Sequence, residues 1–234
     1  MIQHFAKKKR RYEITTWHVL FFLFAIGPAF AQTTTVSSHF TIARLKYSGG
    51  GDWYNDPSMI PNMLDYLKKQ TILKVATEEA QVGILDEKLF SYPFLFMTGH
   101  GRVSFNDKEV ERLRAYLEQG GFLYVDDDYG LDQYFRPEIA KLFPEKNFLP
   151  VPFDHDIFHS HFNFANGLPK IHEHDGKPPE SYAYFHEGRM VVFYTYETNI
   201  SDGWADPDVH KDPPEVREKA LQMGTNIIIY ALTQ

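Results

Sequence analysis

Three polar segments of the 234-residue chain carry side chains that can do chemistry, and each follows an apolar run. They read SGGGDWY (48–54), TGHG (98–101) and DDDYG (126–130). Histidine exchanges protons or binds metals near neutral pH. Adjacent carboxylates are commonly tolerated because they share protons or a cation. The three segments therefore predict an acid–base site or a cation site, provided that the fold brings them together.

The candidate site residues fall into two groups. We predict catalytic roles for His100, Asp126 and Asp127. We predict ligand-binding roles for Gly50, Gly51, Asp52, Trp53, Gly99, Gly101 and Asp128. A divalent cation is the candidate cofactor, and its ligands are left open. A simpler interpretation makes the glycines and His100 tight turns, and the aspartates a helix cap with solvent-facing charges. Neither GxGxxG nor GxxxxGK[ST] is present, which disfavours a phosphate-binding loop.

Two further segments are rich in histidine. His155, His159 and His161 have the spacings HxxxH and HxH, which can chelate a transition metal but are not specific for one. The pattern HExxH is absent. HEHD (172–175) is polar, and we predict that it forms a surface loop.

Aromatic residues near the three polar segments also have two interpretations. Trp53, Tyr54 and Tyr129 can stack on a sugar, although core positions are the simpler expectation. Trp204 stands in the polar run SDGWADPD and is not expected in the core.

Hydrophobic periodicity predicts alternating strands and helices. The expected strands are 40–47, 72–76, 92–97 and 122–125, a short strand within 149–162, and two strands within 181–197. The expected helices are 58–70, 106–121, 132–142 and 213–234. Continuous apolar strands such as YPFLFM suit a parallel sheet covered on both faces. The fold class is therefore α/β, a three-layer sandwich with a mainly parallel sheet. Its strand ends would gather the three polar segments at one edge.

The N-terminal region has the features of an export signal. The basic block KKKRR (7–11) precedes an apolar stretch (17–31) that ends in the small-x-small pattern Ala29-Phe30-Ala31. We predict a signal peptide over 1–31, a disordered leader over 32–39 and a single α/β domain over 40–234. The mature protein would be periplasmic or secreted, with no membrane span after cleavage.

Charge and cysteine content exclude several functions. Cleavage would remove five basic residues and Glu13, which changes the formal charge from −7 to −11. Such an acidic surface disfavours nucleic acid as a partner. The chain has no cysteine, so thiol catalysis and disulfides are excluded.

Several runs along the chain together resemble one known family. They read ARLKYSGGGDWY, YPFLFMTGHG, LRAYLEQGGFLYVDD, GRMVVFYTYETNISDGW and ALQMGTNIIIYAL, and they span about residues 40–233. These runs resemble the bacterial domain of unknown function 4159 (DUF4159). That family looks like a branch of the class I glutamine amidotransferase-like superfamily, which implies a flavodoxin-like sandwich.

The same resemblance implies roles for particular positions. Asp126 or Asp127 would stand where the superfamily has its nucleophilic cysteine, and MTGHG looks like the loop that donates backbone amides to an oxyanion. DHDIF and GLPKI resemble the trehalose-utilisation-type branch, which implies a sugar as ligand.

Two functions fit these observations. The first is a secreted binding or assembly module that recognises a polar small molecule, a sugar or a partner protein. The second is a hydrolase-like enzyme that uses His100 with Asp126–Asp128, with or without a divalent cation that activates water. We favour the first, because the chain lacks the nucleophile of the superfamily it resembles.

Overall fold

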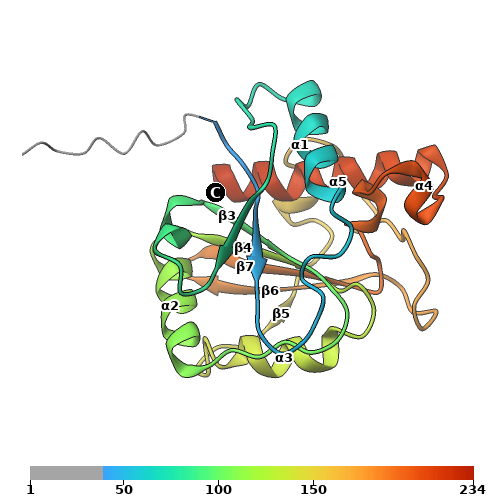
Figure 1. Cartoon of the computed structure of the whole chain (residues 1–234). Helices are drawn as coiled ribbons and strands as arrows, with labels where there is room; N and C mark the ends of the chain where they lie inside the picture. The colour runs from blue at the N-terminus through green and yellow to red at the C-terminus, as the bar shows by residue number, and fades with distance from the viewer. Residues whose placement is uncertain (1–38) are drawn as a thin grey trace, which may run out of the picture. The chain divides into compact units, whose positions relative to one another are not determined.

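The computed structural model describes residues 39–234, which belong to one compact unit (Figure 1). Its strands are β1 (Ala43–Lys46), β2 (Ala80–Gly83), β3 (Phe94–Met97), β4 (Phe122–Asp126), β5 (Leu149–Pro150), β6 (Glu180–His186) and β7 (Arg189–Tyr196). Its α-helices are α1 (Met59–Gln70), α2 (Asp107–Glu118), α3 (Asp132–Ala140), α4 (Pro207–His210) and α5 (Pro214–Thr233). Three 3-10 turns complete it: η1 (Glu87–Ser91), η2 (Asp156–Phe158) and η3 (Asp202–Trp204).

All seven strands form one mixed sheet in the order β2-β1-β3-β4-β7-β6-β5. Strands β2, β1, β3, β4 and β7 run parallel, while β6 and β5 add an antiparallel edge. The β6–β7 hairpin turns at Glu187 and Gly188, both with positive φ (50° and 83°), as a two-residue hairpin turn with matching twist requires. The prediction of an α/β fold with a mainly parallel sheet is confirmed.

Helices cover both faces of the sheet, so the domain has three layers. In Figure 1, α1 and α5 lie on one side of the strands, and α2 and α3 lie on the other. Successive strand residues point to opposite faces, and the two cores show this alternation. Phe96 packs into the core under α1 and α5, while its neighbour Leu95 packs into the core under α2 and α3.

Local sequence signals explain where helix α2 begins and ends. Asn106 accepts a hydrogen bond from the Glu109 amide at 3.1 Å, and the Glu109 carboxylate accepts one from the Asn106 amide at 2.8 Å. This capping box satisfies two amides that the first helical turn leaves free. Gly120, with φ of 114°, lies just beyond the helix end.

Two expectations about the elements are wrong. Residues 72–76 do not form a strand, because only Val75 makes a bridge, to Phe40, and Ile72 is fully exposed. The second strand is instead β2, at Ala80–Gly83. Trp204 is not in a polar loop on the surface but is fully buried, and its indole N–H donates to the carbonyl of Ala220 at 2.9 Å.

Two predictions about the N-terminal region concern residues that the structure does not describe. The predicted signal peptide (1–31) and all of the predicted leader except its last residue lie outside the described residues. Within residues 39–234, no helix is both long enough and apolar enough to cross a membrane.

Close packing of Trp204 against α5 depends on a glycine. A Cβ atom added at Gly224 would lie 2.6 Å from the Trp204 ring and 2.7 Å from the sulfur of Met63. Replacing Gly224 by alanine improves helix propensity by about 1 kcal/mol, but overpacking a core costs about 1–3 kcal/mol.

We therefore expect Gly224→Ala to lower the free energy of unfolding by up to about 2 kcal/mol, measured by urea denaturation. Gly83→Ala is the matched control, because a Cβ there comes no closer than 3.4 Å to another atom. Equal effects of the two substitutions would contradict this account of the Trp204 contact.

Candidate functional site

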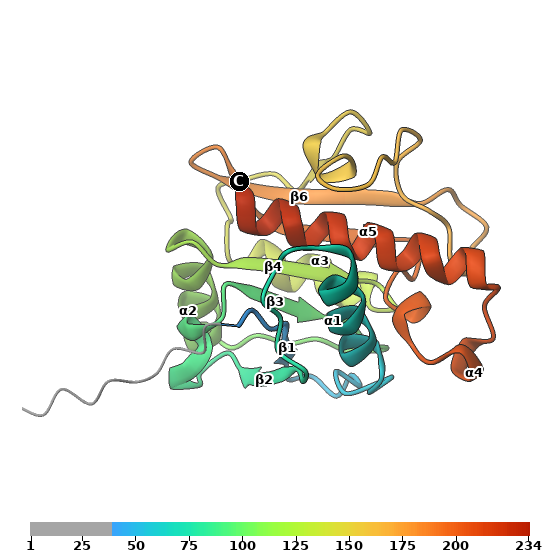
Figure 2. The ribbon, with the colours of Figure 1, turned by 90° about the horizontal axis from the view of Figure 1, so that it is seen from above.

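The three predicted polar segments meet at one edge of the sheet. Parallel strands end on the same side, and in Figure 2 the arrowhead of β3 points to the side on which α4 lies. The His100 ring, after β3, places its Nδ1 3.1 Å from the Asp52 carboxylate and 3.5 Å from the Asp128 carboxylate. The backbone amide of His100 also donates to Asp52 at 2.5 Å. Side chains from the loops after β1, β3 and β4 are therefore in contact.

The glycines of the first two loops allow the loops to touch. The Gly51 amide donates to the Arg102 carbonyl at 2.9 Å, and the Ser104 amide donates to the Ser48 carbonyl at 2.7 Å. A Cβ on Gly51 would lie 2.7 Å from the His100 carbonyl oxygen. Gly99, with φ of 135°, would collide with Tyr47 if it carried a side chain. These two glycines are needed for the contact between the loops.

The other predicted glycines and aromatic residues differ in exposure. A Cβ on Gly50 would meet nothing within 4 Å, and one on Gly101 would come no closer than 3.8 Å to another atom. Trp53 packs against the core under α2 and α3 and also lies under the Lys46 ammonium, 5.4 Å from the ring centroid. The expectation of core positions is wrong for Tyr54 and Tyr129, which are 64% and 55% exposed.

Asp126 is a buried link between the end of β4 and the loop after β7. One carboxylate oxygen accepts hydrogen bonds from the Ser201 amide at 2.6 Å and the Ser201 hydroxyl at 2.8 Å. The other accepts one from the Thr195 hydroxyl. Burial raises the pKa of Asp126 to about 7, although the hydrogen bonds from Thr195 and Ser201 act in the opposite direction.

Asp127 has one occupied oxygen and one free oxygen. Its Oδ1 accepts hydrogen bonds from the amides of Leu131 at 2.8 Å and Asp132 at 3.1 Å, at the start of α3. Its Oδ2 is buried and has no hydrogen-bond partner in the protein. Burial raises the pKa of Asp127 to about 6, and the Leu131 amide opposes that shift.

Asp128 lies at the centre of the cluster. It accepts hydrogen bonds from the side-chain amides of Asn55 and Asn199, the latter at 3.1 Å. Burial, followed by the negative charges of Asp202 and Asp126, raises its pKa to about 9. Burial and the acidic neighbours thus favour the protonated form of Asp128. The catalytic and binding roles assigned from the sequence stay predictions.

The loop after β7 supplies site residues that were not predicted. Glu197 and Asn199 both have positive φ (59° and 49°). Glu197 pairs with Lys170 at 3.0 Å, and the Asn199 side-chain amide donates to Asp202 at 2.9 Å. The segment ETNISD (197–202) directly follows the buried strand β7. Polar segments after β1, β3 and β4 were predicted to meet where the parallel strands end, and the same reasoning would have included this segment.

The segment HEHD (172–175) is not simply a surface loop, which corrects the expectation. The His174 side chain is only 3% exposed and hydrogen-bonds through Nε2 to the side-chain oxygen Oδ1 of Asn199. His172 lies between two carboxylates, 2.8 Å from Asp202 and 2.9 Å from Asp212. The hydrogen bond to Asp202 raises the pKa of His172 to about 9, although burial opposes it.

The other histidine group has local roles. His155 accepts a hydrogen bond from the Ile157 amide at 3.2 Å, and the His159 ring contacts Asn163 and the Phe153 carbonyl. Among residues 39–234, the one group of at least three histidine and carboxylate side chains with ligand atoms close enough to share a metal ion is His172, Asp202 and His210.

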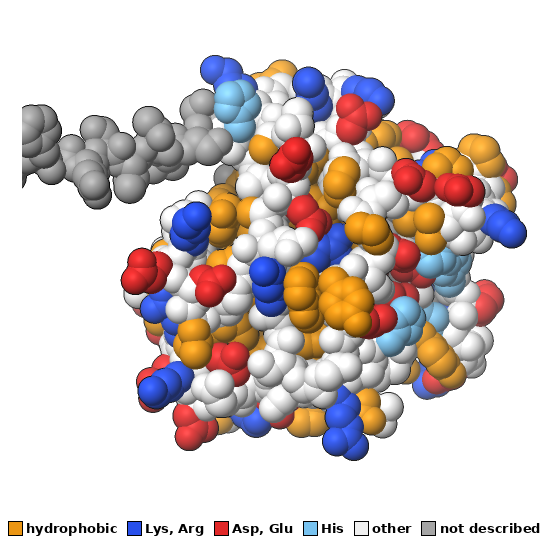
Figure 3. All heavy atoms as spheres, in the orientation of Figure 1, with side chains coloured by type: hydrophobic (Ala, Val, Ile, Leu, Met, Phe, Trp, Pro, Cys, Tyr) orange, Lys and Arg blue, Asp and Glu red, His pale blue; other side chains and the backbone are white. Residues whose placement is uncertain are grey.

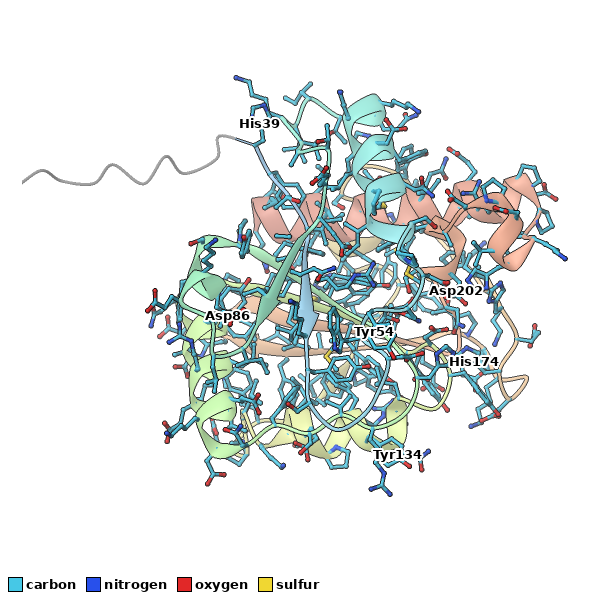
Figure 4. The ribbon with its side chains drawn as sticks, viewed as in Figure 1. His39, Tyr54, Asp86, Tyr134, His174 and Asp202 are labelled. Carbon is cyan, nitrogen blue, oxygen red and sulfur yellow. The ribbon has the colours of Figure 1, made fainter. Side chains whose placement is uncertain are left out.

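Histidine and acidic side chains lie together on the surface beside α4. Figure 3 shows histidine side chains next to acidic ones on the right of the view, and Figure 4 places Asp202 and His174 near each other on that side. A pocket of about 290 Å³ opens in this region between the ends of β4 and β7. Its polar and aromatic lining includes Asp127, Tyr129, Asp132, His174, Tyr196 and Glu197.

Two unpaired polar atoms lie in the residues that line this pocket. Asp127 Oδ2 and His174 Nδ1 are 3.9 Å apart, and both are buried without a hydrogen-bond partner in the protein. Tyr129 packs edge-on against the His174 ring with centroids 5.1 Å apart. Buried polar atoms are normally paired, so these two atoms are exceptions among the residues that line the pocket.

The raised pKa of Asp126 predicts how stability varies with pH. Since its pKa is about 7 in the folded protein against a usual 3.8, the folded state keeps a proton that the unfolded state loses. This contribution to the free energy of unfolding is complete below about pH 4 and is lost as the pH rises to about 7.

Asp126→Asn mimics the protonated acid and does not titrate. We expect the stability of the unmodified protein to fall relative to this variant by up to about 1.4 kcal/mol per pH unit between pH 4 and 7. Urea denaturation at several pH values measures this, with Glu111→Gln on the exposed side of α2 as control. A pH-independent difference would contradict a raised pKa at Asp126.

Comparison with protein families identifies where the chain belongs. The family model described as Domain of unknown function (DUF4159) matches residues 41–232. Comparison with the curated proteins finds no match. The match covers nearly all of the described domain, including the loops after β1, β3, β4 and β7 that build the site. The chain therefore belongs to the DUF4159 family.

Proposed function

We propose that this protein binds a small, hydroxyl-rich polar molecule, a carbohydrate being the class that fits best. The ligand would occupy the pocket between the ends of β4 and β7. The observation that carries the proposal is the pair of buried, unpaired atoms Asp127 Oδ2 and His174 Nδ1, 3.9 Å apart among the residues that line the pocket.

Hydrogen-bond partners determine what His174 offers to a ligand. The Asn199 side-chain amide donates to Asp128 and Asp202, so its oxygen is the atom that faces His174 Nε2. That oxygen accepts a hydrogen bond from the Nε2 N–H. Burial lowers the pKa of His174, which keeps the ring neutral. Its Nδ1 therefore carries a lone pair and is an acceptor.

Both unpaired atoms are thus acceptors, and the pocket selects for donors. An ionised Asp127 and a neutral His174 would repel an anionic ligand but would each accept a hydrogen bond from a hydroxyl group. Leaving a buried acceptor unpaired costs about 1–3 kcal/mol, so a ligand that supplies two donors recovers that free energy. Adjacent hydroxyls of a sugar ring meet this need.

Aromatic side chains add an apolar surface to the pocket. Tyr129 is 55% exposed, and its positive φ of 62° is rare for a bulky residue. Such backbone strain is concentrated at ligand sites. Tyr196 also lines the pocket. Pockets for small molecules commonly combine aromatic walls with a few placed polar groups.

We also infer a distant relation to the class I glutamine amidotransferase-like superfamily with its flavodoxin-like sheet. The order β2-β1-β3-β4-β7 supports it, because its parallel strands follow the flavodoxin-like order. The chain has no cysteine, so this relation does not extend to thioester chemistry. A binding role is consistent with both facts.

A hydrolase is the second candidate, and one contact favours it. Asp52 holds the His100 ring at 3.1 Å, and Asp128, with its raised pKa, lies 3.5 Å from the same nitrogen. A carboxylate-oriented histidine beside an acid with a raised pKa can perform general acid–base catalysis. However, the ring partners found for His100 among the described residues are carboxylates rather than a hydroxyl nucleophile.

Asp127→Asn tests the binding proposal, because it keeps the Oδ1 acceptor at α3 but replaces the pocket acceptor by a donor. We expect a panel of mono- and disaccharides, screened by thermal shift and measured by calorimetry, to yield a ligand whose affinity falls about tenfold or more in this variant.

Asp52→Asn is the matched control, since it changes the His100 pair but not the pocket. Unchanged sugar affinity in Asp127→Asn, or no binding by any sugar of the panel, would contradict the proposal. Turnover of a glycoside or ester panel that is lost in Asp52→Asn would favour the hydrolase instead.

We propose further that residues 1–31 direct export to the periplasm or beyond. The basic block, the apolar stretch and the small residues Ala29 and Ala31 support this. We expect the protein recovered from the periplasmic fraction to begin at Gln32, as measured by intact mass, and Ala31→Arg to block processing. An unprocessed chain in the cytoplasm would contradict export.

A further inference from the structure

Three side chains beside the pocket form a second arrangement with its own chemistry. His172 comes from the loop before β6, Asp202 from η3, and His210 from α4. One ligand atom of each lies within 4.8 Å of those of the other two. We propose that His172, Asp202 and His210 bind a first-row transition-metal ion, and that this ion is Zn²⁺. This site goes beyond the proposed sugar pocket, from which Asn199 separates it.

The outer nitrogens of both histidines are held by carboxylates. His172 Nε2 lies 2.9 Å from Asp212, and His210 Nε2 lies 2.6 Å from Asp56. Histidines that bind a metal nearly always donate their other ring N–H to a carboxylate or carbonyl, which fixes the tautomer and turns the free nitrogen toward the ion. In this protein the Nδ1 atoms of both histidines lie near Asp202 and are the nitrogens that would bind the ion.

Asp202 is a buried carboxylate with one oxygen that has no partner among the described residues. Its side chain is only 3% exposed, and its Oδ1 has no hydrogen-bond partner in the protein. Its Oδ2 lies 2.8 Å from His172 Nδ1 and 3.9 Å from His210 Nδ1. A buried carboxylate with a free oxygen is costly unless that oxygen is paired or coordinates a metal.

The spacing of these atoms suits a small ion. Two ligands of a tetrahedral zinc, each about 2.0–2.1 Å from it, lie roughly 3.3 Å apart. Asp202 Oδ2 lies 2.8 Å from one ring nitrogen and 3.9 Å from the other, and these distances lie on either side of about 3.3 Å. Small side-chain rotations would therefore bring these atoms to the separation that zinc ligands have. Two imidazoles favour zinc, copper, iron or nickel over magnesium or calcium.

Access and ligand number indicate an open site. His172 and His210 are about a quarter exposed (25% and 26%), so an ion can reach them from solvent. Three protein ligands leave a coordination position for water or a substrate, as in catalytic zinc sites, whereas structural sites close all four. The rival account is an ion-pair network in which a protonated His172 lies between Asp202 and Asp212 without metal.

Metal titration separates the two accounts. The purified protein is stripped with a chelator, and binding of Zn²⁺ is measured by calorimetry and by the metal content after dialysis. We expect one zinc per chain and a rise in melting temperature, because an ion that binds only the folded state stabilises it. Magnesium and calcium at the same concentration should have no such effect.

Variants identify the ligands. We expect His210→Gln to weaken zinc binding at least a hundredfold, and Asp212→Asn, which changes only the carboxylate that holds His172, to weaken it ten- to a hundredfold. His161→Gln, at an exposed histidine elsewhere on the surface, should leave zinc affinity unchanged. His210 is on the four-residue α4, and circular dichroism of each variant checks that it has folded.

Three results would overturn the proposal. They are less than one-fifth of an equivalent of zinc per chain, affinity unchanged in His210→Gln, or an equal loss in His161→Gln. Any of them would favour the metal-free ion-pair network or nonspecific binding by surface histidines.

Discussion

The buried carboxylate of Asp126 is the interaction on which the site depends. It joins the end of β4 to Ser201 through two hydrogen bonds and to Thr195 on β7 through a third. Asn199 and Asp202 lie on either side of Ser201 in the chain, so this anchor also determines where they are. Without it, the loop after β7 would lose its position relative to the loops after β3 and β4.

The same loop explains how so many acids share a small region. Asn55 and Asn199 both donate to Asp128, and His172 and His210 each lie between carboxylates. Donors thus alternate with acceptors, and the raised pKa of Asp128 favours its uncharged form. Like charges therefore repel each other less than the sequence DDD suggests.

Much of the sheet and part of the site could be predicted from the sequence. Buried strands such as 92–97 have continuous apolar runs, and the strand-end argument correctly brought His100, Asp52 and Asp128 together. Strand β2 was missed because AQVG has only one buried residue, Val82. Trp204 was misplaced because its burial depends on Gly224 and Ala220, which are distant in the sequence. His172, His174 and His210 come from segments without periodicity, so only the tertiary fold shows their partners.

The joined loops after β1 and β3 have a consequence for how this domain meets its ligands. In open α/β sheets the usual crevice lies where the chain reverses its direction of winding across the sheet, which here falls between these two strands. Hydrogen bonds between Gly51 and Arg102, and between Ser48 and Ser104, seal that crevice with backbone. The open space has moved two strands along, to β4 and β7. A ligand search guided by topology alone would therefore begin at a place where the backbone of the two loops closes the surface.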